Sequence, residues 1–96
     1  MELTVRDAPD DERYEIRDGD RLLGIAAYHR RGDVLGFTPT EADPAEGRSG
    51  LGSTLVRSAL DDVRAKGEKI IAQCPFVRGW IERHPDYADL VLHDNG

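Results

Sequence analysis

The chain has 96 residues, enough for a single domain (residues 1–96) with one modest core. Its net charge of −6 at pH 7 argues against a nucleic-acid partner, because affinity for a phosphate backbone comes mainly from clustered Lys and Arg. Cys74 is the single cysteine, which excludes an internal disulfide framework, and no apolar run approaches the ~20 residues of a membrane helix. We therefore expect a cytoplasmic protein, a monomer or weak homodimer, that binds neither nucleic acid nor membrane.

The N-terminal part of the chain has the pattern of an antiparallel meander. Apolar and polar residues alternate in residues 3–5 and 14–16, which is the period of half-buried strands. Two apolar segments, 22–28 and 34–37, follow, and turns rich in Asp, Gly or Pro separate the segments from one another. We expect four consecutive strands here.

After Gly50 the spacing of apolar residues changes to that of an amphipathic helix. The residues on its apolar face are Leu51, Leu55, Val56, Ala59, Leu60 and Val63. Lys66 and Gly67 predict where this helix ends, because glycine readily adopts the left-handed conformation that closes many helices.

A short strand and a second helix complete the predicted elements. Residues 69–73 lie between helix breakers and contain Ile70 and Ile71, which favour a central strand. Pro75 suits the first turn of a helix, and Pro85 prevents its continuation. The predicted apolar face of this helix consists of Phe76, Val77, Trp80, Ile81 and His84. The expected fold class is α+β, an antiparallel-led mixed sheet in the order strand, strand, strand, strand, helix, strand, helix.

A glycine-rich turn, Gly47-Arg48-Ser49-Gly50-Leu51-Gly52, opens the first helix. The first turn of a helix has free N–H donors and a partial positive charge, so such a turn suits an anion such as pyrophosphate. A Walker-type loop would need a lysine before Ser53, and a dinucleotide fingerprint needs the opposite glycine spacing after the first strand of a parallel unit. The remaining pattern, x-x-x-Gly-x-Gly after an antiparallel strand, resembles the pyrophosphate motif of the GCN5-related N-acetyltransferases, and a plain surface loop is the alternative.

Two C-terminal segments extend this resemblance to residues 14–91. They are Cys74-Pro75-Phe76-Val77 and Arg83-His84-Pro85-Asp86-Tyr87, and both are similar to segments of small single-domain members of that family. The resemblance implies a site for acetyl-CoA, with pyrophosphate on the backbone of the glycine turn, pantetheine beside residues 40–43 and the thioester directed toward Cys74. The cofactor-binding residues implied in this way are Ala42, Gly47, Arg48, Ser49, Gly50, Leu51, Gly52, Ser53, Arg78, Arg83 and His84.

Cys74 is the first candidate catalytic residue. It lies between a predicted strand end and a predicted helix start, where the positive end of the helix and the nearby Arg78 would favour the thiolate. In the family that the chain resembles, the cysteine is either a transient acetyl acceptor or a proton donor to the leaving thiolate of coenzyme A. A buried structural thiol is the alternative.

The chain departs from the family pattern where a general base is expected. Pro39 occupies the position of the family histidine, which leaves Glu41 as the nearest substitute base. His84 matches the Arg-His-Pro segment but also lies on the apolar helix face, so it has either a packing or a functional role. Neither the histidines nor the single cysteine have the spacing of a metal site.

Three functions remain open on the sequence. The first is transfer of an acetyl group from acetyl-CoA to an amine acceptor. The second is a non-catalytic module that binds coenzyme A or an acyl-CoA, as the missing histidine would allow. The third is an interaction domain in which the glycine turn is only a loop.

Overall fold

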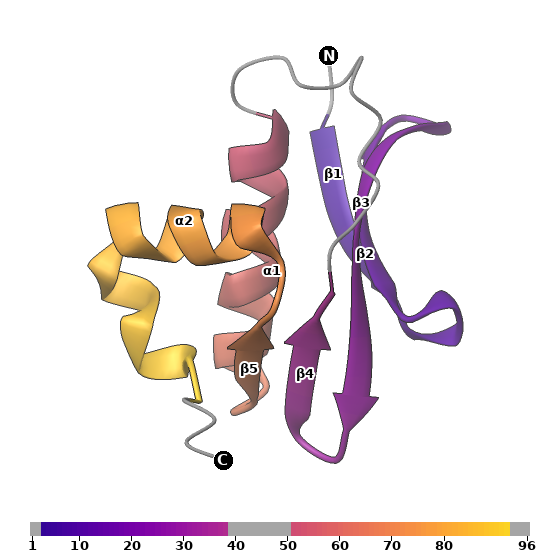
Figure 1. Ribbon diagram of the computed structural model, residues 1–96. Coiled ribbons are helices and arrows are strands. Elements are labelled where there is room, and N and C mark those ends of the chain that lie inside the picture. Colours follow the sequence, from indigo (N-terminus) through magenta and orange to yellow (C-terminus); the bar gives the residue numbers. More distant parts are fainter. Residues whose placement is uncertain (1–2, 39–50, 93–96) are drawn as a thin grey trace.

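The computed structural model describes residues 3–38 and 51–92 (Figure 1). Its elements in chain order are β1 (Leu3–Ala8), the 3₁₀ helix η1 (Pro9–Asp11), β2 (Arg13–Asp18), β3 (Arg21–Arg31), β4 (Val34–Phe37), α1 (Leu51–Ala65), β5 (Lys69–Ala72), α2 (Pro75–Arg83) and the 3₁₀ helix η3 (Pro85–Leu90). This order confirms the predicted α+β class and its succession of strands and helices. No helix within the described residues is long and apolar enough to span a membrane.

The strands form one five-stranded sheet in the order β1-β2-β3-β4-β5. The first three pairings are antiparallel, and β4 and β5 pair in parallel, so the sheet is mixed as predicted. The prediction that β5 is a central strand is wrong. In the part of the chain that the structure describes, its outer edge carries only the isolated bridge between Ile70 and Val91. Ile70 is nevertheless 0% exposed, whereas the other three residues of the strand are partly exposed.

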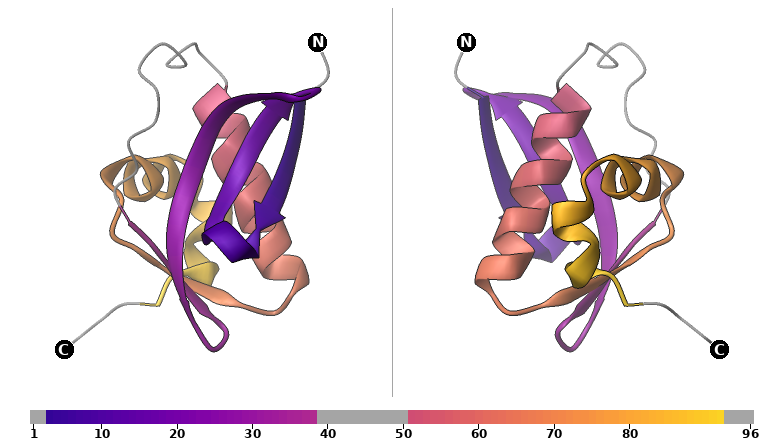
Figure 2. Two further views of the ribbon diagram at one scale, coloured as in Figure 1. Left: turned by 90° about the vertical axis from the view of Figure 1, so that its right-hand side faces the viewer. Right: turned by 90° about the vertical axis from the view of Figure 1, so that its left-hand side faces the viewer.

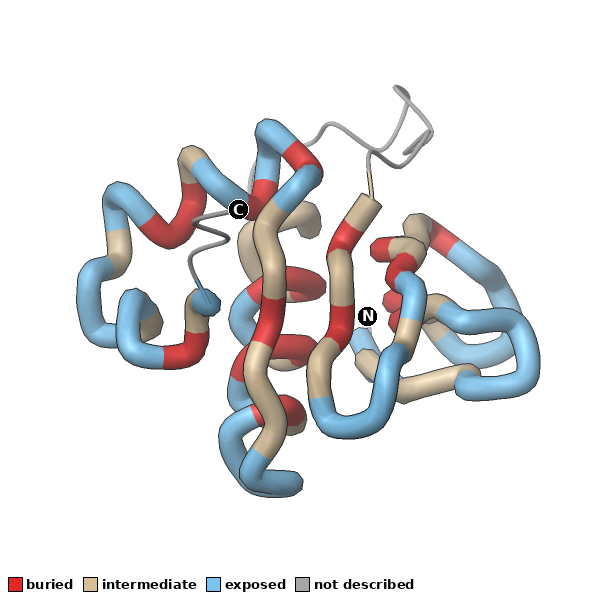
Figure 3. The backbone as a smooth tube through the Cα atoms, turned by 60° about the horizontal axis from the view of Figure 1, so that its bottom comes forward, coloured by how far each residue is buried: buried red, intermediate tan, exposed pale blue. Residues whose placement is uncertain are grey.

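The core lies between one face of the sheet and α1. Figure 2 shows α1, α2 and η3 together on this face of the sheet. These three helices leave the opposite face uncovered. The buried residues gather where the strands and α1 face each other (Figure 3). Leu35, Leu60, Val63 and Ile70 are each 0% exposed, and all apolar residues predicted for α1 are buried except Leu51, which is partly buried.

The C-terminal end of α1 closes as its sequence predicts. Gly67 has φ +70, the left-handed region that glycine adopts without strain. Its N–H donates to the Arg64 carbonyl at 3.1 Å, and the N–H of Glu68 donates to the Val63 carbonyl at 3.0 Å. These two bonds form a Schellman motif, which turns the chain directly into β5.

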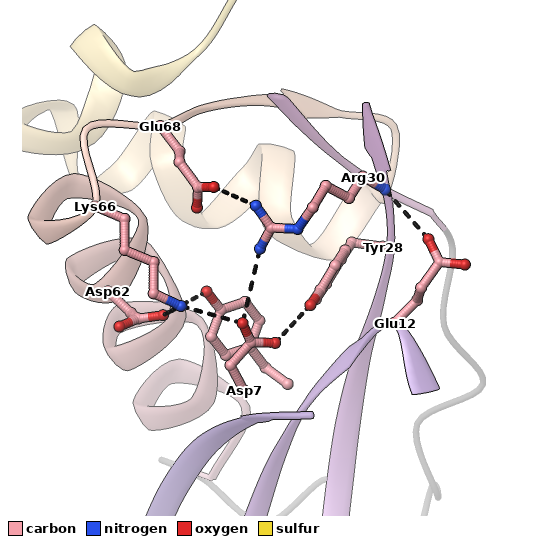
Figure 4. Close-up of polar contacts among 8 residues, drawn as sticks. Asp7, Glu12, Tyr28, Arg30, Asp62, Lys66 and Glu68 are labelled. Carbon is pink, nitrogen blue, oxygen red and sulfur yellow. Dashed lines mark hydrogen bonds and ion pairs between the residues drawn. The ribbon is translucent and has the colours of Figure 1, made fainter. Parts of the chain in front are cut away.

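A polar network ties this end of α1 to β1 and β3 (Figure 4). The Tyr28 hydroxyl donates to Asp7 Oδ1 at 2.5 Å, and Lys66 Nζ lies 3.1 Å from Asp7 Oδ2. Lys66 Nζ also lies 2.8 Å from Asp62 Oδ2. The same Asp62 oxygen accepts a hydrogen bond from the Tyr14 hydroxyl at 2.7 Å. Tyr14 and Tyr28 are buried in the core as predicted. Their hydroxyls also connect β2 to α1 and β3 to β1 through the carboxylates of Asp62 and Asp7.

Candidate cofactor site at the junction of α1 and α2

Part of the predicted site lies outside the described residues. This part comprises Pro39, Glu41, Ala42, Gly47, Arg48, Ser49 and Gly50. The predicted residues that the structure places are Leu51, Gly52, Ser53, Cys74, Arg78, Arg83 and His84.

The parallel strands β4 and β5 separate just before Cys74. Their register ends at Phe37 opposite Ala72, and the last backbone bond runs from the Gln73 N–H to the Phe37 carbonyl at 3.0 Å. The next residue of the β4 side, Thr38, donates its N–H to Ala27 of β3 at 3.2 Å. The β4 side thus stays with β3, while the β5 side turns away into α2.

Cys74 occupies the junction between β5 and α2, as the sequence predicts. Its backbone is extended, with φ −77 and ψ 123, and Pro75 is the first residue of the helix. Its carbonyl accepts the N–H of Arg78 at 2.9 Å, which starts the hydrogen-bond ladder of α2. The residue is only 6% exposed, so its thiol is enclosed by protein rather than bathed in bulk water.

Gly52, in the first turn of α1, is in close contact with α2. A Cβ added at Gly52 would lie 2.7 Å from Phe76 Cζ and 3.3 Å from Phe76 Cε1. The phenyl ring therefore rests on the bare backbone of this turn, in the space that a side chain would occupy. The absence of a side chain at Gly52 is therefore what allows α2 to pack this closely against the start of α1.

Ser53 supplies a second tie between the same two helices. The Trp80 Nε1–H donates to Ser53 Oγ at 2.8 Å, and Trp80 is 1% exposed. The sequence predicts only a backbone role for Ser53. No local pattern relates it to a partner 27 positions away, so only the fold reveals this bond.

Phe76 does not lie on a buried face, contrary to the prediction for this helix. Its side chain is 51% exposed, whereas Val77, Trp80 and Ile81 are buried. The reason is its place in the first turn of α2, which projects toward the start of α1 rather than toward the sheet.

Arg78, Arg83 and His84 lie progressively farther from Cys74 along α2. The helix spans nine residues from Pro75 to Arg83, which is about 13 Å at 1.5 Å per residue. Arg78 Nη2 donates to the Ala72 carbonyl at 3.3 Å, and Arg83 is exposed in the last turn. The structure therefore groups Arg78 with Cys74 and separates Arg83 and His84 from it.

His84 is held in an aromatic cluster. Its ring stacks on Trp80 at a centroid distance of 3.9 Å and an interplanar angle of 15°. Its Nδ1 lies 2.8 Å from the Trp80 carbonyl, so this nitrogen carries the hydrogen that makes the bond. Tyr87 packs edge-on against Trp80 at 5.1 Å, and the hydrogen bond that its hydroxyl donates to Asp61 at 2.7 Å raises its pKa. The cluster ties α2 and η3 to α1.

A groove of about 710 Å³ lies on the outer side of β5, away from β4. It is enclosed by β5, α2, η3 and the segment that returns to β5 at Val91. Its floor is mainly apolar, and Arg78 and Glu82 lie at its polar rim. Local sequence patterns do not reveal this groove, because its walls come from four separate segments.

Known proteins share both the sequence pattern and the architecture of this chain. A family profile for the GCN5-related N-acetyl-transferases matches residues 13–90. The solution structure, determined by NMR, of a GCN5-like candidate N-acetyltransferase from Staphylococcus aureus superimposes with a TM-score of 0.70. The two are 22% identical, and the alignment covers 97% of this chain and 91% of that one. No curated protein was found to match the sequence. On the extent of the profile match, the chain belongs to the GCN5-related N-acetyltransferase family.

Proposed function

We propose that the chain is an N-acetyltransferase that takes its acetyl group from acetyl-CoA and transfers it to an amine. One observation carries the proposal. Cys74 lies where β4 and β5 separate, and the first turn of α2, which follows it, packs against Gly52 in the first turn of α1. This arrangement occurs in a chain that belongs to a family whose members use acetyl-CoA as co-substrate.

The residues at this junction suit a coenzyme A thioester. The backbone N–H groups of Leu51, Gly52 and Ser53, at the start of the described part of α1, are proposed to face the anionic pyrophosphate, which the dipole of the helix favours at that end. Arg78, in the first turns of α2, is a candidate to add positive charge, and Arg83 lies farther along the same helix. Acetyl-CoA supplies a thioester, whose carbonyl carbon is open to attack by an amine.

Cys74 is the residue proposed to act on the reacting atoms. Its enclosed thiol either accepts the acetyl group or gives its proton to the departing thiolate of coenzyme A. An attacking amine must also lose a proton, and Glu41 is proposed to receive it in place of the histidine that the family carries at position 39. Exclusion of water around Cys74 favours transfer to the amine over hydrolysis.

A ligand series measured by thermal unfolding tests the binding half of the proposal. A ligand at one hundred times its Kd stabilises the folded state by about 2.7 kcal/mol, so acetyl-CoA and coenzyme A should raise Tm by several degrees. NAD and ATP serve as controls and should raise Tm less. A shift with NAD or ATP alone, or none with acetyl-CoA, would contradict the proposal.

Release of free thiol from acetyl-CoA in the presence of varied amines tests the catalytic half. We expect Cys74→Ala to keep the Tm shift with acetyl-CoA and to lose most of the transfer rate. Val63→Ala, a buried substitution in the last turns of α1, controls for lost stability alone. Unchanged transfer in Cys74→Ala would remove the cysteine from the mechanism. Binding without transfer to any amine would point instead to a non-catalytic coenzyme A module.

A further inference from the structure

Phe76 has an unusual position for a large apolar side chain. It is 51% exposed, more than Leu3, Leu22 or Leu92, the other exposed large apolar residues of the described chain. It follows Cys74 by two positions and stands at the start of α2. Exposure of a phenyl ring costs free energy unless a ligand or another surface covers it.

One side of this ring is already occupied. Three atoms of the ring, Cζ, Cε1 and Cε2, lie 2.7, 3.3 and 3.4 Å from the position of a Cβ on Gly52. The first turn of α1 thus supports the ring on one side, and its exposed half is free for another contact. The hydrogen bond between Ser53 and Trp80 keeps the two helices at this spacing.

We propose that Phe76 is a cofactor-binding residue whose free surface contacts the pantetheine arm of the coenzyme. This inference rests on the function proposed above, in which pyrophosphate lies at the first turn of α1 and the thioester at Cys74. Phe76 touches that turn and follows Cys74 by two residues, so it is close to both of the ends that the arm must join. The arm carries methyl and methylene groups beside its two amides, and these apolar groups gain free energy by covering the ring.

The neutral ring provides a way to separate this contact from phosphate binding. Phe76 adds no charge, so it should contribute little to the affinity for the nucleotide part of coenzyme A. Adenosine 3′,5′-bisphosphate contains that part and lacks the arm. Loss of the ring should therefore weaken coenzyme A and leave the bisphosphate unaffected.

The experiment measures the Kd of both ligands by calorimetric titration of the full chain. Phe76→Ala should raise the Kd for coenzyme A about tenfold and change the Kd for the bisphosphate by less than twofold. Phe76→Leu should restore much of the affinity, because leucine replaces part of the apolar surface. Leu22→Ala removes a comparably exposed side chain from β3 and should change neither Kd.

Gly52→Ala probes the same contact from the other helix. The added Cβ would displace the ring, so this substitution should also weaken coenzyme A. If it acts through Phe76, its effect should largely disappear in the Phe76→Ala background. A coupling in the Kd for coenzyme A then shows that the two substitutions act through one contact, and an additive result would show that Gly52→Ala acts independently of the ring.

The possible results lead to distinct conclusions. If wild-type protein does not bind coenzyme A, the proposed function fails, whatever the variants do. If wild-type protein binds and Phe76→Ala has the same Kd for coenzyme A, or weakens both ligands equally, the assignment of Phe76 to the arm is wrong. Selective loss of coenzyme A affinity, rescued by leucine, supports it.

Discussion

At the scale of single residues, Glu15 is a carboxylate enclosed on the sheet face that α1 and α2 do not cover. It is only 4% exposed, with Arg13 Nη2 at 2.8 Å from Oε2 and Arg17 Nε at 3.0 Å from Oε1. Hydrogen bonds from Arg13 and then Arg17 hold the pKa of Glu15 below its usual range, against the opposing effect of burial. The three residues alternate along β2, so their side chains share one face.

This lowered pKa predicts how the contribution of Glu15 depends on pH. The stabilisation is present above the unfolded pKa, about 4.3, and is lost as pH falls through the lower folded pKa. At pH 7 Glu15→Gln should reduce the free energy of unfolding by about 1–2 kcal/mol, because charge-assisted bonds are lost. Urea unfolding at pH 7 and pH 3 should show the difference from wild type shrinking at the lower pH. Glu82→Gln, at an exposed carboxylate, is the control, and a difference independent of pH would contradict the assignment.

Phe76 shows where residue patterns lose their predictive power. The helical periodicity of residues 76–84 correctly predicted that Val77, Trp80 and Ile81 are buried. It placed Phe76 with them because it treats a helix as having one apolar face and one neighbour. The first turn of α2 faces α1 instead, and that arrangement depends on where two distant segments meet.

At the scale of elements, two glycines in helical surroundings have opposite requirements. Gly67 closes α1 with φ +70, whereas Gly79 lies inside α2, where an added Cβ would meet nothing within 4 Å. Only the first needs the conformational freedom of glycine.

Alanine substitution should therefore change stability in opposite directions at these two sites. Gly67→Ala should destabilise the protein by about 1 kcal/mol, because a Cβ is strained in the left-handed region. Gly79→Ala should stabilise it by roughly 0.5–1 kcal/mol, because alanine has the higher helix propensity. Thermal unfolding of the two variants under one condition checks this, and shifts of the same sign would refute it.

The elements themselves were well predicted from local signals. Alternation in β2, the apolar stripe of α1 and the breakers Gly67 and Pro75 are each properties of a few neighbouring residues. The position of β5 in the sheet was not, because strand composition reports burial and not the number of neighbours. Ile70 is buried although β5 has only one neighbouring strand, whereas Ile71 lines the groove, and neither environment could be deduced from the sequence.

At the scale of the whole molecule, the polar network unites segments from the two halves of the chain. Asp7 of β1, Tyr28 of β3 and Lys66 after α1 meet within hydrogen-bond distance (Figure 4). Burial, with the hydrogen bond to Asp7 as the second cause, raises the pKa of Tyr28 to about 12. Burial and Asp62 also raise the pKa of Tyr14.

These raised pKa values predict a global loss of stability at alkaline pH. The phenols ionise near pH 10 in the unfolded chain and only at higher pH in the fold, so the stabilisation is complete below pH 10 and declines above it. The free energy of unfolding of wild type should therefore fall between pH 9 and pH 11.5 more steeply than that of Tyr28→Phe. Thermal unfolding across this range measures both slopes. If the two proteins lose stability equally with pH, the fold does not raise the pKa of Tyr28.

The candidate site could be predicted only in part, because some of its contacts join residues that are far apart in the sequence. Cys74 at a strand–helix junction and the helical pattern from residue 51 onward follow from local sequence, and the structure confirms both. The contacts of Gly52 with Phe76 and of Ser53 with Trp80 join residues far apart in the chain. The roles of Glu41 and of the first glycines of the turn stay predictions, since these residues lie outside the described ranges.

The bond between Trp80 and Ser53 also makes the protein its own optical probe. Trp80 is the sole tryptophan of the chain, and its indole nitrogen is bound to the first turn of α1. Its emission therefore comes from one place, and the polarity sensed by the indole changes when that turn moves or is occupied. Events at the junction of the two helices can thus be followed in real time without attaching a dye.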